Sequence, residues 1–352
     1  LSTGEANEYT YDDTSGRLTS MSNGAATLTF TYDSDGFVES IGTTFAPEGR
    51  ERTLSYQYRV SGSSDFVRWL EHRPDEFTQF VMAFSGTSGW LPTSISGGDG
   101  SGIDLTMNYD DGGRLHDWRQ VGGSSSAVFE YDAADRLQAA SYYDGDDPAT
   151  DPLLARPSWG YTDGGLRDAL GNGVPGDTLE DTFGYDVAGR LISATHEHTS
   201  NDDEAYSYDE AGNRYIDGSE SQYLYDDANQ LREDPRYTYT YDANGSRQTR
   251  TARAAGARTE YHYDSENRLI RVTLPSSDNV HFAYDPLGRL VEKVDESAAE
   301  TRRYLYDGDE VLAEFDAAGS MVRRYVTTDG IDMLLGVISG GAHYIAGTDP
   351  LG

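Results

Sequence analysis

The stretch YDSENRLIRV runs from Tyr263 to Val272, and YDPLGRLVEKV runs from Tyr284 to Val294. In both, a tyrosine–aspartate pair is followed by residues that favour tight turns, and then by a short run of alternating apolar and charged residues. Asp, Asn, Pro and Gly suit turns because they form local hydrogen bonds, fix φ or tolerate positive φ. Each stretch therefore predicts the turn and the returning strand of a β-hairpin.

The same motif recurs along the chain. Neighbouring copies lie 22 residues apart from Tyr109 to Tyr131, and 23 residues apart from Tyr185 to Tyr208. This period fits two short strands with their turns, and it indicates a tandem repeat. The tyrosines that begin the copies are Tyr11, Tyr32, Tyr109, Tyr131, Tyr185, Tyr208, Tyr225, Tyr241, Tyr263, Tyr284 and Tyr306.

A second aromatic residue usually stands two positions before the motif tyrosine. Side chains two apart on a strand share a face, so each repeat projects an aromatic pair to one side. Across neighbouring strands these pairs would form an aromatic ladder. The predicted ladder consists of Tyr9, Tyr11, Phe30, Tyr32, Phe129, Tyr131, Phe183, Tyr185, Tyr206, Tyr208, Tyr223, Tyr225, Tyr239, Tyr241, Tyr261, Tyr263, Phe282, Tyr284, Tyr304 and Tyr306.

Such hairpins have an aromatic face that none of them buries alone. Successive units must therefore pair edge to edge into a long sheet. Because sheets twist, the predicted fold is all-β: tandem β-hairpins forming a long twisted sheet that coils into a spiral, shell-like or solenoid-like architecture. The periodicity is compatible with both a closed shell and an open spiral.

The composition agrees with strands and turns. Of 352 residues, 36% are hydrophobic, 39 are glycine and 26 are tyrosine. The formal net charge of −34 makes nucleic acid and anionic membranes poor partners. There is no cysteine, which excludes disulfides and thiolate chemistry, and no 18-residue apolar run that would predict membrane insertion.

The Y-D-x-x-G-R-L units resemble the YD repeats of the Rhs family, which also occur in shell-forming Tc-toxin C-type proteins and in cell-wall-associated and teneurin-like proteins. The resemblance implies a β-ribbon that spirals into a hollow shell, often enclosing a variable C-terminal toxin that is cut free inside it. The residues from Tyr306 to Gly352 resemble the run-in to an Rhs-associated core segment. The resemblance places that core, and the aspartates that cut, beyond Gly352, so we expect this chain to be a piece of a longer protein.

The motif also divides the chain. Between Thr43 and Asp104 it has decayed: Leu54–Tyr58 keeps the aromatic spacing, Thr78–Phe84 favours a strand, and Arg68–Arg73 favours a short helix or an irregular loop. Insertions of this kind are tolerated loops or binding sites on one rim, and we favour the loop. The predicted organisation is 1–42 YD repeats, 43–104 divergent repeats or insertion, 105–141 YD repeats, 142–176 degenerate repeat with loops, 177–326 YD repeats, and 327–352 run-in to a core segment that is itself absent.

Candidate metal sites are weak. His196 and His198 alternate on a predicted strand ahead of Asp202, Asp203 and Glu204, but a third nitrogen ligand is missing, which favours a solvated loop. The acidic stretches 33–36 and 144–147 lack the acidic twelfth ligand of an EF-hand, and 97–100 is a single degenerate copy of a glycine-rich calcium repeat. We therefore predict no metal and no cofactor.

Catalytic motifs do not favour an enzyme either. The chain has no G-x-S-x-G elbow and no glycine loop before a helix, so the sequence predicts no catalytic residue. A DPLG string occurs at Asp285 and again at Asp349, and both are interpreted as turns.

Together these observations predict a non-catalytic structural scaffold, secreted or at the cell surface, that forms part of an Rhs-type β-shell enclosing or presenting a C-terminal effector. The alternative is a self-assembling surface fibre or adhesin built through open sheet edges, and a weaker alternative is carbohydrate binding. The expected partners are further repeats and C-terminal segments of the same longer chain, an enclosed effector, or other copies, with neither nucleic acid nor membrane insertion.

Overall fold

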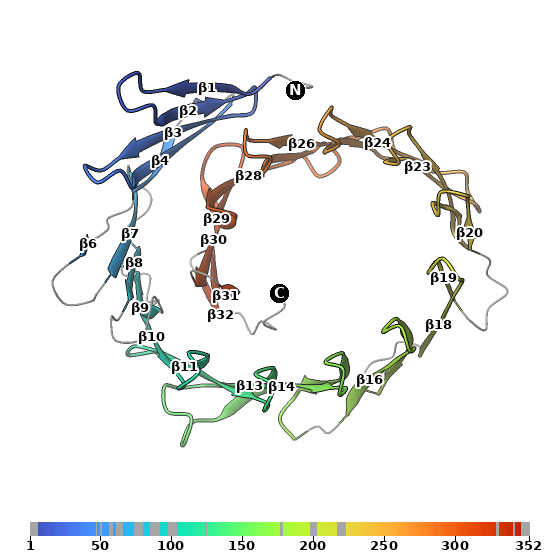
Figure 1. Cartoon of the computed structure of the whole chain (residues 1–352), viewed down its shortest axis with the longest axis horizontal. Coiled ribbons are helices and arrows are strands. Elements are labelled where there is room, and N and C mark those ends of the chain that lie inside the picture. Colours follow the sequence, from blue (N-terminus) through green and yellow to red (C-terminus); the bar gives the residue numbers. More distant parts are fainter. Residues whose placement is uncertain are drawn as a thin grey trace. The chain divides into compact units, whose positions relative to one another are not determined.

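The computed structural model contains β-strands joined by short turns, and it has no helix in the residues that it describes (Figure 1). This confirms the predicted all-β fold of tandem hairpins. The described residues are 6–46, 48–49, 51–55, 59–60, 66–73, 80–84, 92–97, 104–123, 125–176, 179–197, 203–216, 223–328, 331–340 and 342–345.

The chain divides into two compact units. Unit 1 comprises residues Leu1–Ile103, Asp242–Gln248 and Arg258–Gly352, and unit 2 comprises Asp104–Tyr241 and Thr249–Ala257. Strand β23 (Arg247–Ala252) contributes to both. The other strands of unit 1 are β1 Glu8–Tyr11, β2 Leu18–Ser22, β3 Ala26–Tyr32, β4 Val38–Phe45, β5 Glu51–Ser55, β6 Arg59–Val60, β7 Phe66–Arg73, β8 Phe80–Phe84, β9 Pro92–Gly97, β24 Arg258–Tyr263, β25 Leu269–Thr273, β26 Asn279–Tyr284, β27 Leu290–Asp295, β28 Glu300–Asp307, β29 Glu310–Phe315, β30 Met321–Thr328, β31 Ile331–Ser339 and β32 Ala342–Ile345.

In unit 2, successive strands pair antiparallel from β10 to β19 and again from β20 to β22. Its strands are β10 Asp104–Tyr109, β11 Leu115–Gln120, β12 Ser126–Tyr131, β13 Leu137–Tyr143, β14 Leu153–Tyr161, β15 Arg167–Gly173, β16 Glu180–Tyr185, β17 Leu191–His196, β18 Glu204–Tyr208, β19 Arg214–Ile216, β20 Leu224–Tyr225, β21 Leu231–Glu233 and β22 Tyr237–Tyr241.

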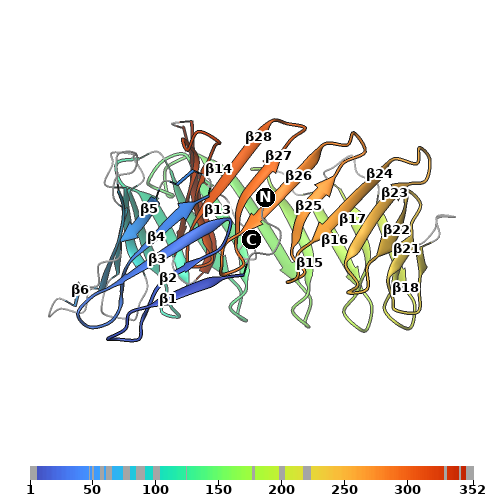
Figure 2. The same cartoon turned by 90° about the horizontal axis from the view of Figure 1, so that it is seen from above.

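Most motif tyrosines end their strand at a β-bulge, but Tyr208 pairs without a register shift and β28 continues past Tyr306 to Asp307. Tyr284 pairs with Leu290, and the register shifts between Ala283 and Tyr284. The fourth residue after the tyrosine usually adopts positive φ, with 64° at Asn267 and 84° at Gly288, whereas Gly16 and Gly308 take this role after Tyr11 and Tyr306. Such a residue closes the turn, which explains why the motif carries Gly, Asn or Asp at this place. Figure 2 shows the resulting strands β24 to β28 running side by side.

The divergent region departs from one prediction. Arg68–Arg73, predicted as a short helix or an irregular loop, lies instead in strand β7. The prediction was wrong because β7 has partners on both sides: Leu70 pairs with Phe80, and Leu54 pairs with His72. Its Phe, Val and Trp residues suit a strand. The neighbouring predictions fall partly outside the described residues, which include Glu51–Ser55 in β5 and Phe80–Phe84 in β8.

The core of unit 1 lies where strands β3 to β5 pack on strands β27 to β29. One cluster joins Leu54 to Leu305 and Phe315, and a second joins Phe45 to Val291. All five side chains are 2% exposed or less. Unit 1 is therefore a two-layer structure at this place, with its apolar contacts between sheet faces.

Candidate functional site

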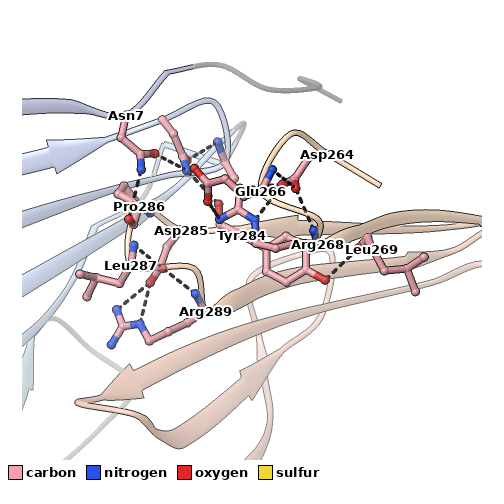
Figure 3. Close-up of polar contacts among 12 residues, drawn as sticks. Asn7, Asp264, Glu266, Arg268, Leu269, Tyr284, Asp285, Pro286, Leu287 and Arg289 are labelled. Carbon is pink, nitrogen blue, oxygen red and sulfur yellow. Dashed lines mark hydrogen bonds and ion pairs between the residues drawn. The ribbon is translucent and has the colours of Figure 1, made fainter. Parts of the chain in front are cut away.

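The junction between two successive hairpins is the recurring site of this fold, and Figure 3 shows one of them. Asp264 begins its turn: its Oδ1 accepts hydrogen bonds from the backbone N–H groups of Glu266 and Arg268, each at 2.9 Å. The backbone N–H of Asn267 also donates to the Asp264 carbonyl at 3.1 Å. The motif aspartate thus satisfies the turn that its sequence position predicts.

The same aspartate holds the motif arginine. Arg268 Nε donates to Asp264 Oδ2 at 2.7 Å, and Nη2 lies 2.7 Å from the same oxygen. This pairing aims the guanidinium at the next hairpin, where its Cζ lies 5.0 Å from the ring centroid of Tyr284. A guanidinium over an aromatic face is attracted by the ring quadrupole. Aspartate, arginine and the next tyrosine therefore form one chain of contacts.

The tyrosine hydroxyl completes the junction. Tyr284 Oη donates to the carbonyl oxygen of Leu269 at 2.8 Å (Figure 3). Leu269 belongs to the preceding hairpin and directly follows Arg268, the arginine that stacks on the Tyr284 ring. The next junction repeats this geometry. Arg289 stacks on Tyr306 at 4.9 Å, and Tyr306 Oη donates to Leu290 at 2.7 Å.

The hydroxyl bond recurs in both units. It joins Tyr32 to Leu18, Tyr131 to Leu115, Tyr161 to Leu137, Tyr185 to Arg167, Tyr208 to Leu191, Tyr225 to Arg214, Tyr241 to Leu231 and Tyr263 to Arg247. The arginine of the preceding turn stacks on the same tyrosine in the pairs Arg17 and Tyr32, Arg114 and Tyr131, Arg136 and Tyr161, and Arg190 and Tyr208.

The residues of the predicted aromatic ladder occupy different surroundings. Phe129 and Tyr239 are buried, whereas Tyr9 and Tyr11 on β1 are 47% and 56% exposed. Tyr261, two residues before its motif tyrosine, lies under Arg247 at 4.6 Å. Arginine thus contacts both members of the aromatic pair in this hairpin.

The sequence pattern assigned no role to the motif arginine, and the predicted ladder did not include Tyr161. The arginine recurs in the Y-D-x-x-G-R-L motif, always one residue before the second strand of the hairpin. This fixed position could have indicated a shared contact. Tyr161 belongs to the degenerate segment, yet it makes the full junction with Arg136 and Leu137. Its Trp-Gly-Tyr context preserved the spacing of two between aromatic residues, which was sufficient to include it.

Burial and hydrogen bonding shift the titration of these groups. Burial alone would raise the pKa of the Asp264 carboxyl. The hydrogen bonds from the backbone N–H and the guanidinium of Arg268 outweigh burial, so the pKa lies below its ordinary value. Burial raises the pKa of Tyr306 to about 12. The junctions are therefore built for an ionised aspartate and a neutral tyrosine.

Stability should consequently fall at both ends of the pH scale. A carboxyl whose pKa is depressed on folding stabilises the protein above its unfolded pKa of about 4, and this contribution is lost as pH falls through the folded pKa. The tyrosines contribute fully below pH 10, and their contribution is lost as pH rises through about 12. Denaturation midpoints measured across pH test this. A midpoint that stays constant between pH 10 and 12 would contradict it, and Tyr306→Phe should reduce the alkaline loss.

The candidate metal residues are only partly described. His196 Nδ1 lies 3.0 Å from Asp181 Oδ2 on the adjacent strand, and this carboxylate raises the pKa of His196. Its backbone N–H donates to Asp203, whereas His198 and Asp202 lie outside the described residues. In the described part of the chain, no group of three or more His, Asp or Glu side chains has a metal-binding arrangement.

The other acidic stretches make turns where they are described. Asp33 Oδ1 accepts the backbone N–H groups of Asp35, Gly36 and Phe37. Asp285 lies in a turn, as predicted, and is fully buried, while Asp349 lies outside the described residues. Within the described ranges, no helix is long and apolar enough to cross a membrane.

Residues 172–313 match the family described as Teneurin YD-shell. Double-stranded DNA deaminase toxin A of Burkholderia cenocepacia (strain H111) is 31% identical over 180 residues, covering 48% of this chain and 12% of that protein. Probable deoxyribonuclease RhsA of Dickeya dadantii (strain 3937) is 26% identical over 248 residues, covering 66% of this chain and 16% of that protein. A solved Tc holotoxin pore of Photorhabdus luminescens aligns with a TM-score of 0.36 at 13% identity, over 91% of this chain and 23% of that one. The chain spans only a small part of these relatives.

Proposed function

We propose that this chain, which matches the Teneurin YD-shell family over residues 172–313 and is similar to Rhs proteins, is a non-catalytic scaffold, part of an extracellular β-shell that encloses or presents an effector. The proposed effector is a C-terminal segment of the same protein. The deaminase and deoxyribonuclease named for the relatives exemplify the kind of effector such a wall would enclose.

The observation that carries this proposal is the use of the motif residues. At the junction of Figure 3, Asp264 forms the turn and holds Arg268, and Arg268 stacks on Tyr284. Tyr284 in turn bonds the preceding strand. Each motif side chain thus contributes to joining one hairpin to the next. A repeat whose polar groups bind one another suits a wall better than a site for small-molecule chemistry.

Such junctions favour a continuous and durable sheet. The hydrogen bond and the cation–π contact are each worth about 1 kcal/mol, and they recur at successive hairpins. Because a repeat array is stabilised by its nearest-neighbour contacts, many modest junctions add up to a wall that opens only at its ends. Enclosure of an effector requires a wall of this kind.

The test uses the full-length protein that carries this chain. Electron microscopy should show closed particles, and limited proteolysis should leave the effector intact while the same effector, expressed alone, is digested. Open ribbons with a protease-sensitive effector would overturn the enclosure. Continuous filaments would instead support the fibre alternative, in which sheet edges join separate copies.

A further inference from the structure

In unit 1, the turn at the end of β29 lacks its usual arginine. This turn, FDAAGS from Phe315 to Ser320, has Phe315 in the place of the motif tyrosine, and Asp316 Oδ1 accepts the N–H groups of Ala318 and Ser320 at 2.9 Å. The preceding turn carries Val311 where the motif has arginine. On the neighbouring strand β28, Arg303 lies opposite Phe315, and its Nη1 donates to the carbonyl oxygens of Asp316 and Ala317 at 3.5 and 3.4 Å.

An arginine from the other sheet layer covers that ring. Arg52, at the start of β5, has its Cζ 4.0 Å from the ring centroid of Phe315 and 5.1 Å from that of Phe45. Its side chain is 2% exposed. The guanidinium thus lies between two aromatic rings, one from each layer, and Arg52 Nη2 donates to the carbonyl oxygen of Gly319 at 3.3 Å.

The way in which Arg52 is held matches the repeats. Glu48, four residues earlier, binds Arg52 with Oε1–Nη2 at 2.8 Å and Oε2–Nη1 at 3.2 Å. In the repeats an aspartate four residues before the arginine does the same, as Asp285 does for Arg289 at 2.7 Å. The acid, the arginine and the aromatic ring of the hairpin junction are therefore all present, but here they connect the two layers.

The ion pairs continue into the second layer. Glu48 Oε2 also lies 3.3 Å from Arg303 Nη1, and Arg303 Nε lies 2.8 Å from Glu292 Oε2. The four side chains are between 2% and 14% exposed, and their formal charges cancel. Buried charges persist only when they are paired, so this line of alternating charges fixes how the layers meet.

We propose that Glu48 and Arg52 form a latch that holds β3 to β5 of unit 1 against β27 to β30, reproducing between layers the arginine link that elsewhere joins successive hairpins. The apolar clusters around Leu54 and Phe45 bury hydrophobic surface between the layers, and the latch fixes how the two layers are aligned. The proposal concerns unit 1 alone, and it stands whether or not the repeats enclose an effector.

The first test measures the separation of the layers in the full chain. Because the chain has no cysteine, spin labels attach only at introduced cysteines, and Glu39→Cys and Asp309→Cys place them at exposed positions of the two layers. Arg52→Ala should increase the population with a long label-to-label distance about tenfold or more. An unchanged distance distribution would overturn the latch.

Arg289→Ala is the matched control, because it removes an arginine that also has an acid and an aromatic partner, Asp285 and Tyr306, but links successive hairpins. It should lower the melting temperature and leave the distance distribution unchanged. If Arg289→Ala separates the layers as much as Arg52→Ala does, Arg52 has no special role and the proposal fails.

A second variant tests the latch without removing a charge. A Cβ at Gly319 (φ +81°) would lie 2.5 Å from Glu48 Oε1, whereas at Gly288 (φ +84°) the nearest atom is Arg268 Nη1 at 3.8 Å. Gly319→Ala and Gly288→Ala therefore cause the same backbone strain, but only the first collides with the latch. The layers should separate in Gly319→Ala alone. Equal behaviour of the two variants would overturn the proposal.

Discussion

Replacing Tyr261 and Tyr263 together with alanine is expected to lower the free energy of unfolding of their part of unit 1 by about 4 kcal/mol. Both rings depend on Arg247: its guanidinium lies 4.6 Å from the Tyr261 ring centroid, and its carbonyl oxygen accepts the Tyr263 hydroxyl at 3.1 Å. The double variant removes two half-buried rings together with these two contacts to Arg247.

Hydrogen exchange of the amides in β24 and β25 measures this effect locally. That readout is needed because a repeat array does not unfold as a single two-state unit. Protection should fall most in this hairpin and its neighbours and less in β31. The control is Tyr263→Phe, which keeps the ring and loses the hydroxyl bond, and should cost about 1 kcal/mol. Similar protection in the double variant and the wild type would refute the role of the aromatic pair.

Asp285→Ala is expected to destabilise unit 1 by about 3 kcal/mol, because it leaves a charged arginine without its acid. The Asp285 side chain is fully buried, accepts the N–H groups of Leu287 and Arg289 through Oδ1, and binds the Arg289 guanidinium through Oδ2 at 2.7 Å. Arg289 is itself 14% exposed. Hydrogen exchange of the amides in β26 and β27, compared between the wild type and the variant, measures the difference.

Asp242→Ala separates the two roles of the aspartate. Asp242 makes the same turn bonds, to the N–H groups of Asn244 and Ser246 at 2.9 Å, but its turn has serine where the motif has arginine. This variant should cost only about 1 kcal/mol, the value of the lost turn bonds. A loss as large as that of Asp285→Ala would show that turn formation, and not the arginine, accounts for the effect.

These two aspartates qualify the interpretation of the motif. The sequence indicated that paired aromatics do the packing and that aspartates make turns. The turn role is present at Asp242, Asp264 and Asp285. At Asp264 and Asp285 the carboxylate also aims an arginine at the next tyrosine. A motif shows which residues recur together, but not that one of them orients another toward the following repeat.

The hairpins, their turns and their order could be predicted from the sequence, because they depend on residues within a few positions of one another. Asn267 and Gly288 stand where positive φ closes a turn, and the spacing of the motif sets the strand length. The residue types of a local pattern specify the backbone preferences of its turns and the alternation of side chains along its strands.

The contacts across the layers could not be predicted from the sequence and are known from the folded structure. Arg52 and the carbonyl of Gly319 are 267 positions apart, and no periodicity connects them. The same holds for β7, whose strand state depends on partners in β5 and β8 that its own residues do not specify. Sheet twist brings distant strands face to face, and the pairing then depends on the shape and charge of both surfaces. A pattern of neighbours does not contain that information.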